Sequence, residues 1–253
     1  MGHVISISNQ KGGVGKTTTA INLSASIAAG ERDCLLIDCD PQGNATTGLG
    51  VDPASLEQGL YDILFGELPP EKAITETPLP RLHLIGATGN LIGAEVELAS
   101  MKSKEFRLRN AISALRQRYD YIFLDCPPSL GFLTINALTA AESVLVPLQC
   151  EYYALEGLSQ LLTTAKAVKR GLNPVLRSAS ILLTMYDSRN NLSRQVQDEA
   201  RALFKERVFK TVIPRNVRLS EAPSYGKPII LYDIGSKGAQ SYLALARELI
   251  GRE

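Results

Sequence analysis

The chain has 253 residues, of which 45% are hydrophobic and 21% are charged, and its net charge is +1 at neutral pH. This composition is ordinary for a globular protein with a substantial core. No run of 18 apolar residues is present, which excludes a typical transmembrane helix. Four cysteines without a C-x-x-C pair or histidine partners predict buried free thiols, which fits a reducing cytoplasm.

The first predicted elements are a strand over residues 4–8 and a helix over residues 17–29. The strand is a short apolar run with β-branched residues that begins almost at the N-terminus, so we expect no signal peptide. The helix carries Ala, Leu and Ile at helical spacing. Between them, residues 10–18 read Gln-Lys-Gly-Gly-Val-Gly-Lys-Thr-Thr. A glycine-rich turn between a strand and a helix is the context of a phosphate-binding loop.

The loop departs from the usual pattern, G-x-x-x-x-G-K-[ST], at one position. Gly15, Lys16 and Thr17 match it, whereas Gln10 stands where the first glycine is expected. The next residue is a second lysine, Lys11. A basic group this close to Lys16 changes which phosphate contacts are possible.

The residue types of the loop suit a nucleotide. The glycines allow close approach of phosphate, and consecutive backbone amides at a helix N-terminus bind anions. Lys16 is expected to reach the β- and γ-phosphates, and the Thr17 hydroxyl to bind Mg²⁺. The predicted nucleotide contacts in this loop are Lys11, Gly12, Gly13, Val14, Gly15, Lys16, Thr17 and Thr18.

Two acidic segments follow buried strands. Residues 35–37 lead into Asp38 and Asp40, and residues 121–124 lead into Asp125. Ligands of an open parallel sheet bind at the carboxyl ends of its strands, so these carboxylates should face the nucleotide. Asp125 is expected to hold Mg²⁺ through water. Asp40 could position or deprotonate the water that attacks the γ-phosphate.

The rest of the chain alternates strands with helices. We expect strands around residues 81–85, 120–125, 143–147, 179–183 and 208–213. We expect helices near residues 104–117, 155–170, 190–205 and 238–250, and residues 51–80 are the most loop-like. The alternation predicts an α/β fold with a doubly wound, mainly parallel sheet and helices on both faces.

The charges are distributed unevenly. Residues 166–227 contain 13 Lys and Arg against 5 Asp and Glu, while the remainder has a surplus of seven acidic residues. This asymmetry suggests a basic face on the C-terminal half that suits a polyanion. No zinc-finger or helix-turn-helix motif is evident, so contact with the phosphate backbone is expected without sequence readout.

Five segments resemble, in order, the ParA/Soj chromosome-partitioning ATPases, which carry a deviant phosphate loop of the MinD/ParA type. These segments span residues 11–18, 38–44, 125–129, 149–157 and 212–223. The resemblance covers essentially the whole chain. It implies a single P-loop NTPase-like domain over residues 1–253, with ATP and Mg²⁺ as cofactors and hydrolysis of ATP to ADP and phosphate.

The resemblance also implies roles for single residues. Lys11 is the signature lysine that reaches across an ATP-bound sandwich dimer to the partner's phosphates, and it would act with Lys16 and Asp40 in catalysis. An added cation from each subunit would offset the charge of two buried triphosphates. The residues implied to lie against the adenine are Met185, Pro214 and Asn216.

The same resemblance implies that the basic face binds DNA. Arg189 and Arg218 match positions at which Soj-like proteins bind double-stranded DNA non-specifically, and the weaker candidates are Lys210, Arg194 and Arg215. A ParB-like centromere-binding partner would stimulate a slow intrinsic turnover, because no arginine finger is evident near the phosphates. The protein is then expected to be cytoplasmic and nucleoid-associated, and to make no membrane contact.

Rival functions use the same fold. A MinD-like division-site ATPase would carry a basic amphipathic membrane helix at its C-terminus, whereas this sequence stops at Gly251-Arg252-Glu253. A nitrogenase-like reductase needs cysteines placed for an iron–sulfur cluster, and Cys126 and Cys150 lack the expected flanking glycines. A ligase is a further possibility on this fold. A passive DNA-coating protein would not need an intact phosphate loop and acidic pair.

Overall fold

A seven-stranded sheet organises the chain in the computed structural model, which describes residues 2–151, 154–177 and 179–252. The strand order is β3-β4-β2-β5-β1-β6-β7. The strands are β1 (His3–Ile7), β2 (Cys34–Asp38), β3 (Ile74–Glu76), β4 (Leu82–Ile85), β5 (Tyr121–Asp125), β6 (Ser143–Gln149) and β7 (Ser180–Thr184). All neighbours pair in parallel except β3, which runs antiparallel to β4 at one edge.

The central strands are buried on both faces. Every residue of β2 and β5 is buried, which explains why both are continuous apolar runs that end in an aspartate. Their register pairs Asp38 with Asp125 at the carboxyl end. The sheet therefore brings two predicted site carboxylates side by side.

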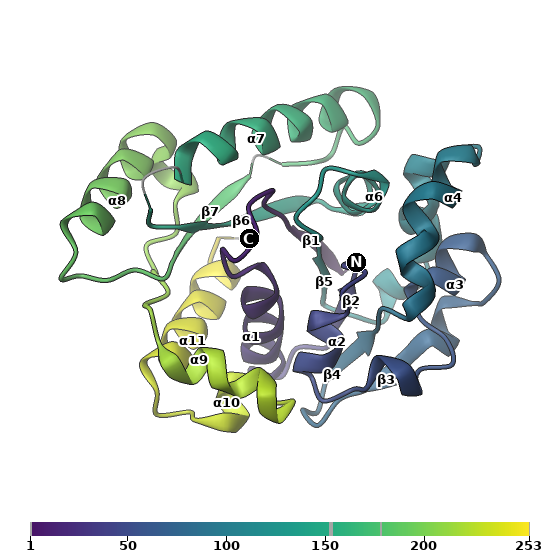
Figure 1. Cartoon of the computed structure of the whole chain (residues 1–253), viewed down its shortest axis with the longest axis horizontal. Coiled ribbons are helices and arrows are strands. Elements are labelled where there is room, and N and C mark those ends of the chain that lie inside the picture. Colours follow the sequence, from purple (N-terminus) through teal and green to yellow (C-terminus); the bar gives the residue numbers. More distant parts are fainter. Residues whose placement is uncertain (1, 152–153, 178, 253) are drawn as a thin grey trace.

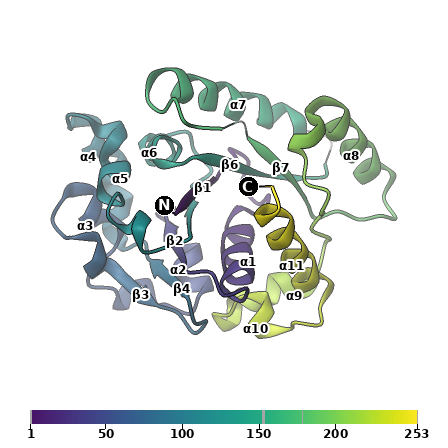
Figure 2. The ribbon, with the colours of Figure 1, turned by 180° about the vertical axis from the view of Figure 1, so that it is seen from behind.

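Helices cover both faces of the sheet (Figures 1 and 2), and each face has its own apolar core. One core includes residues of α3 (Leu60–Phe65), α4 (Ala94–Ser100), α5 (Arg107–Ala111), α6 (Phe132–Ala140), α7 (Ala154–Gly171) and α8 (Asn191–Phe204). The other includes residues of α1 (Lys16–Ala28), α2 (Asn44–Gly48), α9 (Val217–Glu221), α10 (Ile229–Tyr232) and α11 (Lys237–Ile250). The predicted doubly wound, mainly parallel α/β fold is confirmed.

Helix α1 is held deep in the second core. Small residues make up much of its sequence. The hydroxyls of Ser24 and Ser26 donate hydrogen bonds to backbone carbonyls one turn earlier in the helix. The helix packs against α11, where the Thr19 hydroxyl lies 3.1 Å from the buried Tyr242 hydroxyl. This burial fixes the loop that precedes α1.

Residues 208–213 do not form the predicted strand. Isolated bridges pair Val208 with Ile181 and Pro214 with Tyr186, and the amides of Phe209 and Ile213 bond to carbonyls of β7, but no continuous ladder forms among the described residues. The backbone amides of Lys210 and Thr211 bond instead to the carboxylate of Glu248, 2.7 and 2.8 Å away. A side chain of α11 thus takes up the donors that a sheet ladder would need.

The predicted helix over residues 104–117 is broken into short pieces, η4 (Lys104–Phe106), α5 and η5 (Leu115–Gln117). Asn136 of α6 explains the break at the first piece, because its side chain bonds both the Leu108 amide and the Lys104 carbonyl. Residues 51–80 are also more ordered than expected, since they hold α3 and β3. Among the described residues, no helix is long and apolar enough to cross a membrane.

Candidate functional site

The phosphate loop between β1 and α1 has the backbone of an anion site. Gly13 and Gly15 have φ values of +74° and +90°, in the left-handed region that favours glycine. Gly15 is the N-cap of α1 and supplies no side-chain cap, so the first amides of the helix remain available to a ligand. A Cβ at Gly12 or Gly13 would meet nothing within 4 Å, which shows that the loop borders open space.

Lys16 lies at the base of this loop and is 7% exposed. Burial lowers the pKa of its ammonium, while Asp125 and Asp40 oppose the shift. The ammonium donates to the Lys11 carbonyl at 3.1 Å. The lysine is therefore turned back onto its own loop, facing the acidic side of the site.

Two carboxylates at the ends of β2 and β5 are fully buried. Burial raises the pKa of Asp38 to about 6, although Thr46 and the Asp40 amide donate hydrogen bonds to it. Burial also raises the pKa of Asp125 well above its usual range, with Asp38 adding to the shift while Thr17 and Lys16 oppose it. Both carboxylate oxygens of Asp125 accept no hydrogen bond from the described part of the chain. Such buried, unsatisfied oxygens call for a cation or its water.

Asp40 begins the loop between β2 and α2 and is 7% exposed. Its carboxylate accepts a hydrogen bond from the Gln42 amide at 3.0 Å, and its carbonyl accepts one from the Gly43 amide. Its own amide donates to Asp38. The turn therefore holds one carboxylate at the wall of the cavity described next.

A cavity of about 500 Å³ lies over the phosphate loop. Predicted site residues that line it are Gly12, Gly13, Gly15, Lys16, Thr17, Thr18, Asp40 and Met185. Its other lining residues include Gln42, Asn44, Thr47, Pro128 and Pro223. Val14 contributes differently: its side chain is buried and its carbonyl accepts a hydrogen bond from the Thr184 hydroxyl at 2.8 Å.

The residues around Asp125 fit a magnesium ion. Thr17 lines the cavity, and the orphaned Asp125 oxygens lie close enough for Thr17 to affect their pKa. No group of three or more His, Cys, Asp and Glu side chains forms a metal cluster among residues 2–151, 154–177 and 179–252. Mg²⁺ suits such a place, because it keeps several waters and binds one or two protein groups together with phosphate oxygens.

A second cavity of about 510 Å³ adjoins the first and shares Gly15, Thr18, Met185 and Pro223 with it. The three residues expected to contact adenine, Met185, Pro214 and Asn216, all line this cavity. Met185 adopts φ +50°, a left-handed conformation that is uncommon for a side chain of this size. We call the second cavity the base cavity, because the three residues expected to contact adenine line it.

Lys11 lines neither of these cavities. Its ammonium pairs with the Glu151 carboxylate of the same chain at 3.1 Å, and the two side chains are 40% and 46% exposed. Glu151 belongs to the motif at residues 149–157. Residues 152 and 153 of that motif lie outside the described residues, so its interpretation rests on the remainder.

The arginines implied to contact DNA lie outside the cavities as well. Arg189 makes a two-pronged pair with Asp187, with its Nε and Nη2 at 3.0 and 2.9 Å from the two carboxylate oxygens. Arg218 pairs with Glu221 at 2.9 Å and with Asp233 at 3.5 Å. Of the weaker candidates, Arg215 lines the base cavity, Arg194 bonds Asn191, and Lys210 lies at the opposite edge of the sheet.

Sequence reasoning missed the residues that tie the site to the rest of the fold. The Thr184 hydroxyl joins the end of β7 to the phosphate loop, and Tyr242 lines the base cavity from α11. Neither position has a local pattern that marks it. Pro128 and Pro223, in contrast, lie in segments that the family resemblance already singled out.

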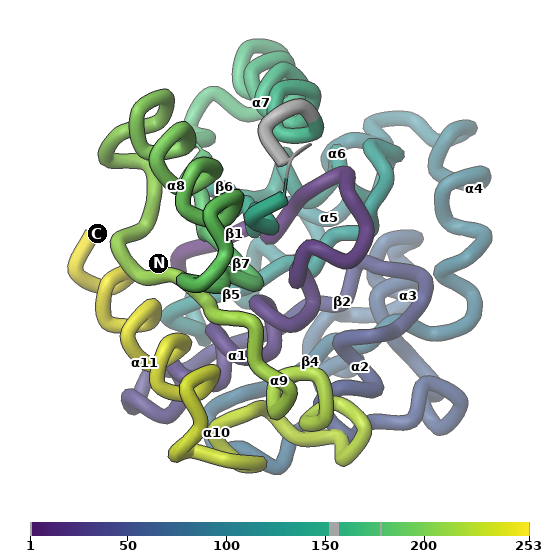
Figure 3. Tube along the Cα trace, turned by 60° about the vertical axis from the view of Figure 1, so that its left-hand side comes forward, coloured from purple at the N-terminus to yellow at the C-terminus, as the bar shows by residue number. Residues whose placement is uncertain are grey.

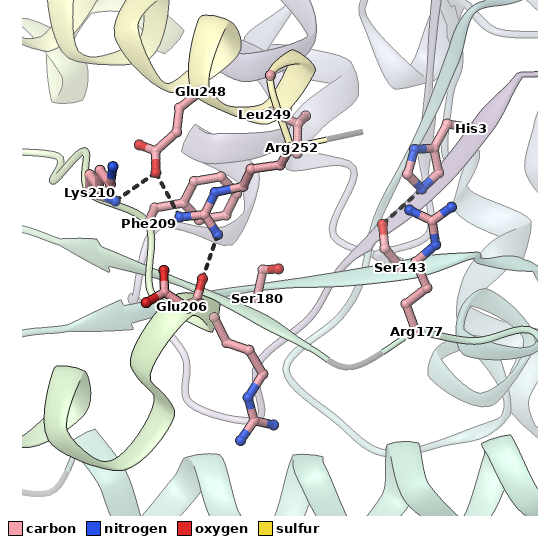
Figure 4. Close-up of a pocket in the computed structure, with 12 residues that line it drawn as sticks. His3, Ser143, Arg177, Ser180, Glu206, Phe209, Lys210, Glu248, Leu249 and Arg252 are labelled. Carbon is pink, nitrogen blue, oxygen red and sulfur yellow. Dashed lines mark hydrogen bonds and ion pairs between the residues drawn. The ribbon is translucent and has the colours of Figure 1, made fainter.

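A further cavity of about 630 Å³ opens at the opposite edge of the sheet, near both described chain ends. In Figure 4, Arg252 lies over the Phe209 ring and points toward Glu248, while His3, Ser143 and Arg177 stand on the other side. Arg252 donates to Glu248 at 2.7 Å and to the Val208 and Glu206 carbonyls. These charged groups are engaged with the fold itself.

Known proteins resemble this chain over most or all of its length. A family model described as an AAA domain matches residues 2–178. The chromosome partitioning protein ParA of Myxococcus xanthus is 59% identical over 100% of this chain and 89% of its own length. The sporulation initiation inhibitor protein Soj of Bacillus subtilis is 57% identical over 98% of both chains.

Solved structures agree on the fold. Cobyrinic acid a,c-diamide synthase of Mycobacterium smegmatis, with bound ADP and magnesium, has a TM-score of 0.87 and 37% identity, covering 99% of this chain and 94% of its own. The same protein with a bound ATP analogue and magnesium gives the same score. The higher identity to the partitioning proteins decides between these relatives, and the resemblance found in five sequence segments is confirmed. With its phosphate loop, its strand-end aspartates and these full-length relatives, the chain belongs to the ParA/Soj family of chromosome-partitioning ATPases.

Proposed function

We propose that this chain is an ATP-dependent DNA-partitioning switch, built as one domain over residues 1–253. The observation that carries the proposal is that an uncapped helix N-terminus and the buried Lys16 line one cavity, and that the buried Asp125 interacts electrostatically with this lysine. Donors that surround a cavity beside unsatisfied carboxylate oxygens suit a nucleotide bound with a cation. ATP and Mg²⁺ are the cofactors that fit.

Each residue of the site has a part in the binding or the hydrolysis of ATP. Lys16 exchanges the Lys11 carbonyl for phosphate oxygens and offsets their charge. Thr17 and Asp125 hold Mg²⁺, which supplies further neutralisation of the phosphates. Asp40, held at the cavity wall by its own turn, orients the attacking water. Met185, Pro214 and Asn216 hold the adenine.

Lys11 links the nucleotide to a second copy of the chain. In the free chain its ammonium is paired with Glu151 and partly exposed, so it is available to a competing anion. In the ATP-bound sandwich dimer it leaves Glu151 and reaches the partner's phosphates. Hydrolysis then removes the charge that this lysine recognises, and the dimer weakens.

DNA binding is the output of the switch. Arg189 and Arg218 contact the phosphate backbone without reading the bases, and pairing two subunits doubles the basic surface. A ParB-like protein accelerates the slow intrinsic hydrolysis and releases the dimer. The protein is then nucleoid-associated while it carries ATP, and cycles of binding and release move chromosome or plasmid DNA.

The test compares molecular mass and DNA affinity with ADP, ATP and a non-hydrolysable ATP analogue. Light scattering should give a monomer with ADP and a dimer with the analogue, and only the dimer should bind a random-sequence duplex tightly. Affinity should fall steeply with salt. DNA binding that is equally strong with ADP and with the analogue would contradict the proposal.

A further inference from the structure

Of the two arginines implied to contact DNA, the more exposed one, Arg189, is already paired with an anion. The Arg189 side chain is 88% exposed, yet its guanidinium makes two parallel bonds to Asp187. The Arg189 backbone amide donates a third, at 3.0 Å, to the same carboxylate. These bonds lower the pKa of Asp187 to about 2, and Arg215 adds to the shift. Asp187 thus occupies the fork that a DNA phosphate would use.

The paired segment begins at the nucleotide site. Asp187 stands three residues after Thr184, whose hydroxyl bonds the Val14 carbonyl of the phosphate loop. Between them, Met185 has its left-handed backbone and lines both nucleotide cavities. A ligand in either cavity can therefore contact Met185, two residues before Asp187.

A second set of bonds ties the turn to the base cavity. The Tyr186 amide donates to the Ile213 carbonyl at 3.0 Å, and the Arg215 amide donates to the Tyr186 carbonyl at 3.1 Å. The turn is thus held between the phosphate loop and the loop that lines the base cavity. Figure 3 shows the β1–α1 loop in purple, α8 in green and α9 in yellow-green, all turned toward the viewer.

We propose that Asp187 is a positioning residue that competes with DNA phosphate for Arg189, and that nucleotide in the adjoining cavities sets how strongly it competes. The inference rests on the proposed function, because it assumes that Arg189 contacts DNA. It adds a regulatory carboxylate that lies outside the phosphate loop and the acidic pair. The free chain then holds its own DNA-binding arginine in a self-neutralised state.

The other candidate arginine has the same arrangement. Arg218 is bonded to Glu221 and Asp233, and Glu221 also accepts a hydrogen bond from the Tyr232 hydroxyl. Both arginines follow residues of the base cavity, since Arg218 comes two residues after Asn216. Paired arginines at both positions support a design in which the charges are masked until DNA displaces the carboxylates.

The competition must be weak enough to be broken. Exposed ion pairs are easily exchanged, so a DNA phosphate can displace Asp187. Removing this competitor should tighten DNA binding by about two- to fivefold, which is the range expected from exposed pairs. A gain of this size is measurable by fluorescence anisotropy on a labelled random duplex.

The experiment compares Asp187→Asn with Asp198→Asn at fixed salt. Asp198 lies exposed on α8 of the same region, and no ion pair joins it to another described residue. Both variants remove one negative charge, so the second measures the general effect of charge on DNA binding. We expect Asp187→Asn to bind DNA more tightly than Asp198→Asn, with the larger gain in ADP than in the non-hydrolysable ATP analogue.

Each outcome decides the matter. Equal affinities of the two variants, or weaker binding by Asp187→Asn, would overturn the competition. An equal gain in both nucleotide states would overturn the link to the nucleotide. If the wild-type protein binds no DNA in any nucleotide state, the proposed function itself fails. Circular dichroism at rising temperature checks that both variants are folded.

Discussion

Cavities of similar size lie at the two ends of the central strands, which we call the carboxyl edge and the amino edge. The charged groups around the two cavities are arranged differently. At the carboxyl edge, a cavity of about 500 Å³ faces Lys16 and lies beside Asp125, whose oxygens accept no bond from the described residues. At the amino edge, a cavity of about 630 Å³ is lined by Glu248 and Arg252, which bond each other and the backbone. Among the described residues, none that lines the amino-edge cavity has a buried polar side-chain atom without a hydrogen bond, whereas Asp125 beside the first cavity has two.

The difference teaches that cavity size alone does not mark a site. At the amino edge, Glu248 and Arg252 form hydrogen bonds to the backbone of the segment after α8. These bonds hold α11 against that segment and leave the two side chains engaged in the fold. At the carboxyl edge the fold leaves donors and acceptors open at strand ends, where parallel sheets bind ligands. Variants at the two edges should therefore fail in different ways.

The largest effect is expected from Asp40→Ala. If this carboxylate orients the attacking water, the rate of ATP hydrolysis should fall about 100-fold or more, while ATP still binds. The measurement is phosphate release at saturating ATP, together with the mass of the protein by light scattering. Normal turnover by this variant would remove Asp40 from the mechanism. Trapping of the variant as a dimer on DNA would strengthen the proposal.

Lys16→Ala should weaken ATP binding by about 100-fold, because it removes a charge-assisted contact to phosphate from a buried position. Calorimetric titration with the non-hydrolysable analogue measures the change. The matched control is Lys210→Ala at the amino edge, which removes the same charge and keeps the backbone bond to Glu248. Equal losses in both variants would erase the distinction between the edges.

Glu151→Gln should favour the dimer by about two- to fivefold, because it releases Lys11 from an exposed pair. The measurement is the protein concentration at which half of the chains are dimeric with the ATP analogue. Glu199→Gln on α8 removes an equal charge from an exposed position and serves as the control. If both variants dimerise as the wild type does, Glu151 does not restrain Lys11.

Glu248→Ala is expected to leave nucleotide binding unchanged. This change should instead lower the free energy of unfolding by about 1–3 kcal/mol, because three hydrogen bonds to a carboxylate are lost. Chemical denaturation measures the loss, and analogue titration checks that binding is unchanged. A marked loss of ATP affinity in a folded Glu248→Ala protein would show that the amino edge serves the site.

The same carboxylate gives a pH dependence with a defined sign. Burial tends to raise the pKa of Glu248, but hydrogen bonds from Thr211, Lys210 and Arg252 outweigh it and hold the pKa below its ordinary value of 4.5. A lowered pKa means that the ionised form stabilises the fold above pH 4.5 and that this stability is lost as pH falls further. Glu248→Gln should therefore lose less stability than the wild type between neutral and acid pH.

The sequence predicted the parts of the site that have local patterns. The phosphate loop was predicted because a strand, a glycine turn and a helix follow each other directly, and the aspartates because they end buried apolar strands. The residues expected to contact adenine came only from the family resemblance, and the structure brings Met185, Pro214 and Asn216 to one cavity. Their separation in the chain leaves no spacing by which they could be recognised.

The fold was predicted in class but not in every element. The central strands are continuous apolar runs that parallel sheets require, so they were found within a residue or two. The predictions of a strand over residues 208–213 and of one helix over residues 104–117 were wrong. In both segments a side chain from a distant element, Glu248 or Asn136, forms hydrogen bonds to the backbone. Such tertiary bonds override local preference and cannot be read from a window of sequence.

The contact between the Lys16 ammonium and the Lys11 carbonyl has a consequence for the speed and cost of nucleotide exchange. Because the Lys16 ammonium already has an acceptor within the loop, a bound phosphate would exchange one acceptor for another and order few new bonds. Little conformational entropy is then lost on binding. ATP and ADP should then replace each other while the backbone of the loop keeps its shape.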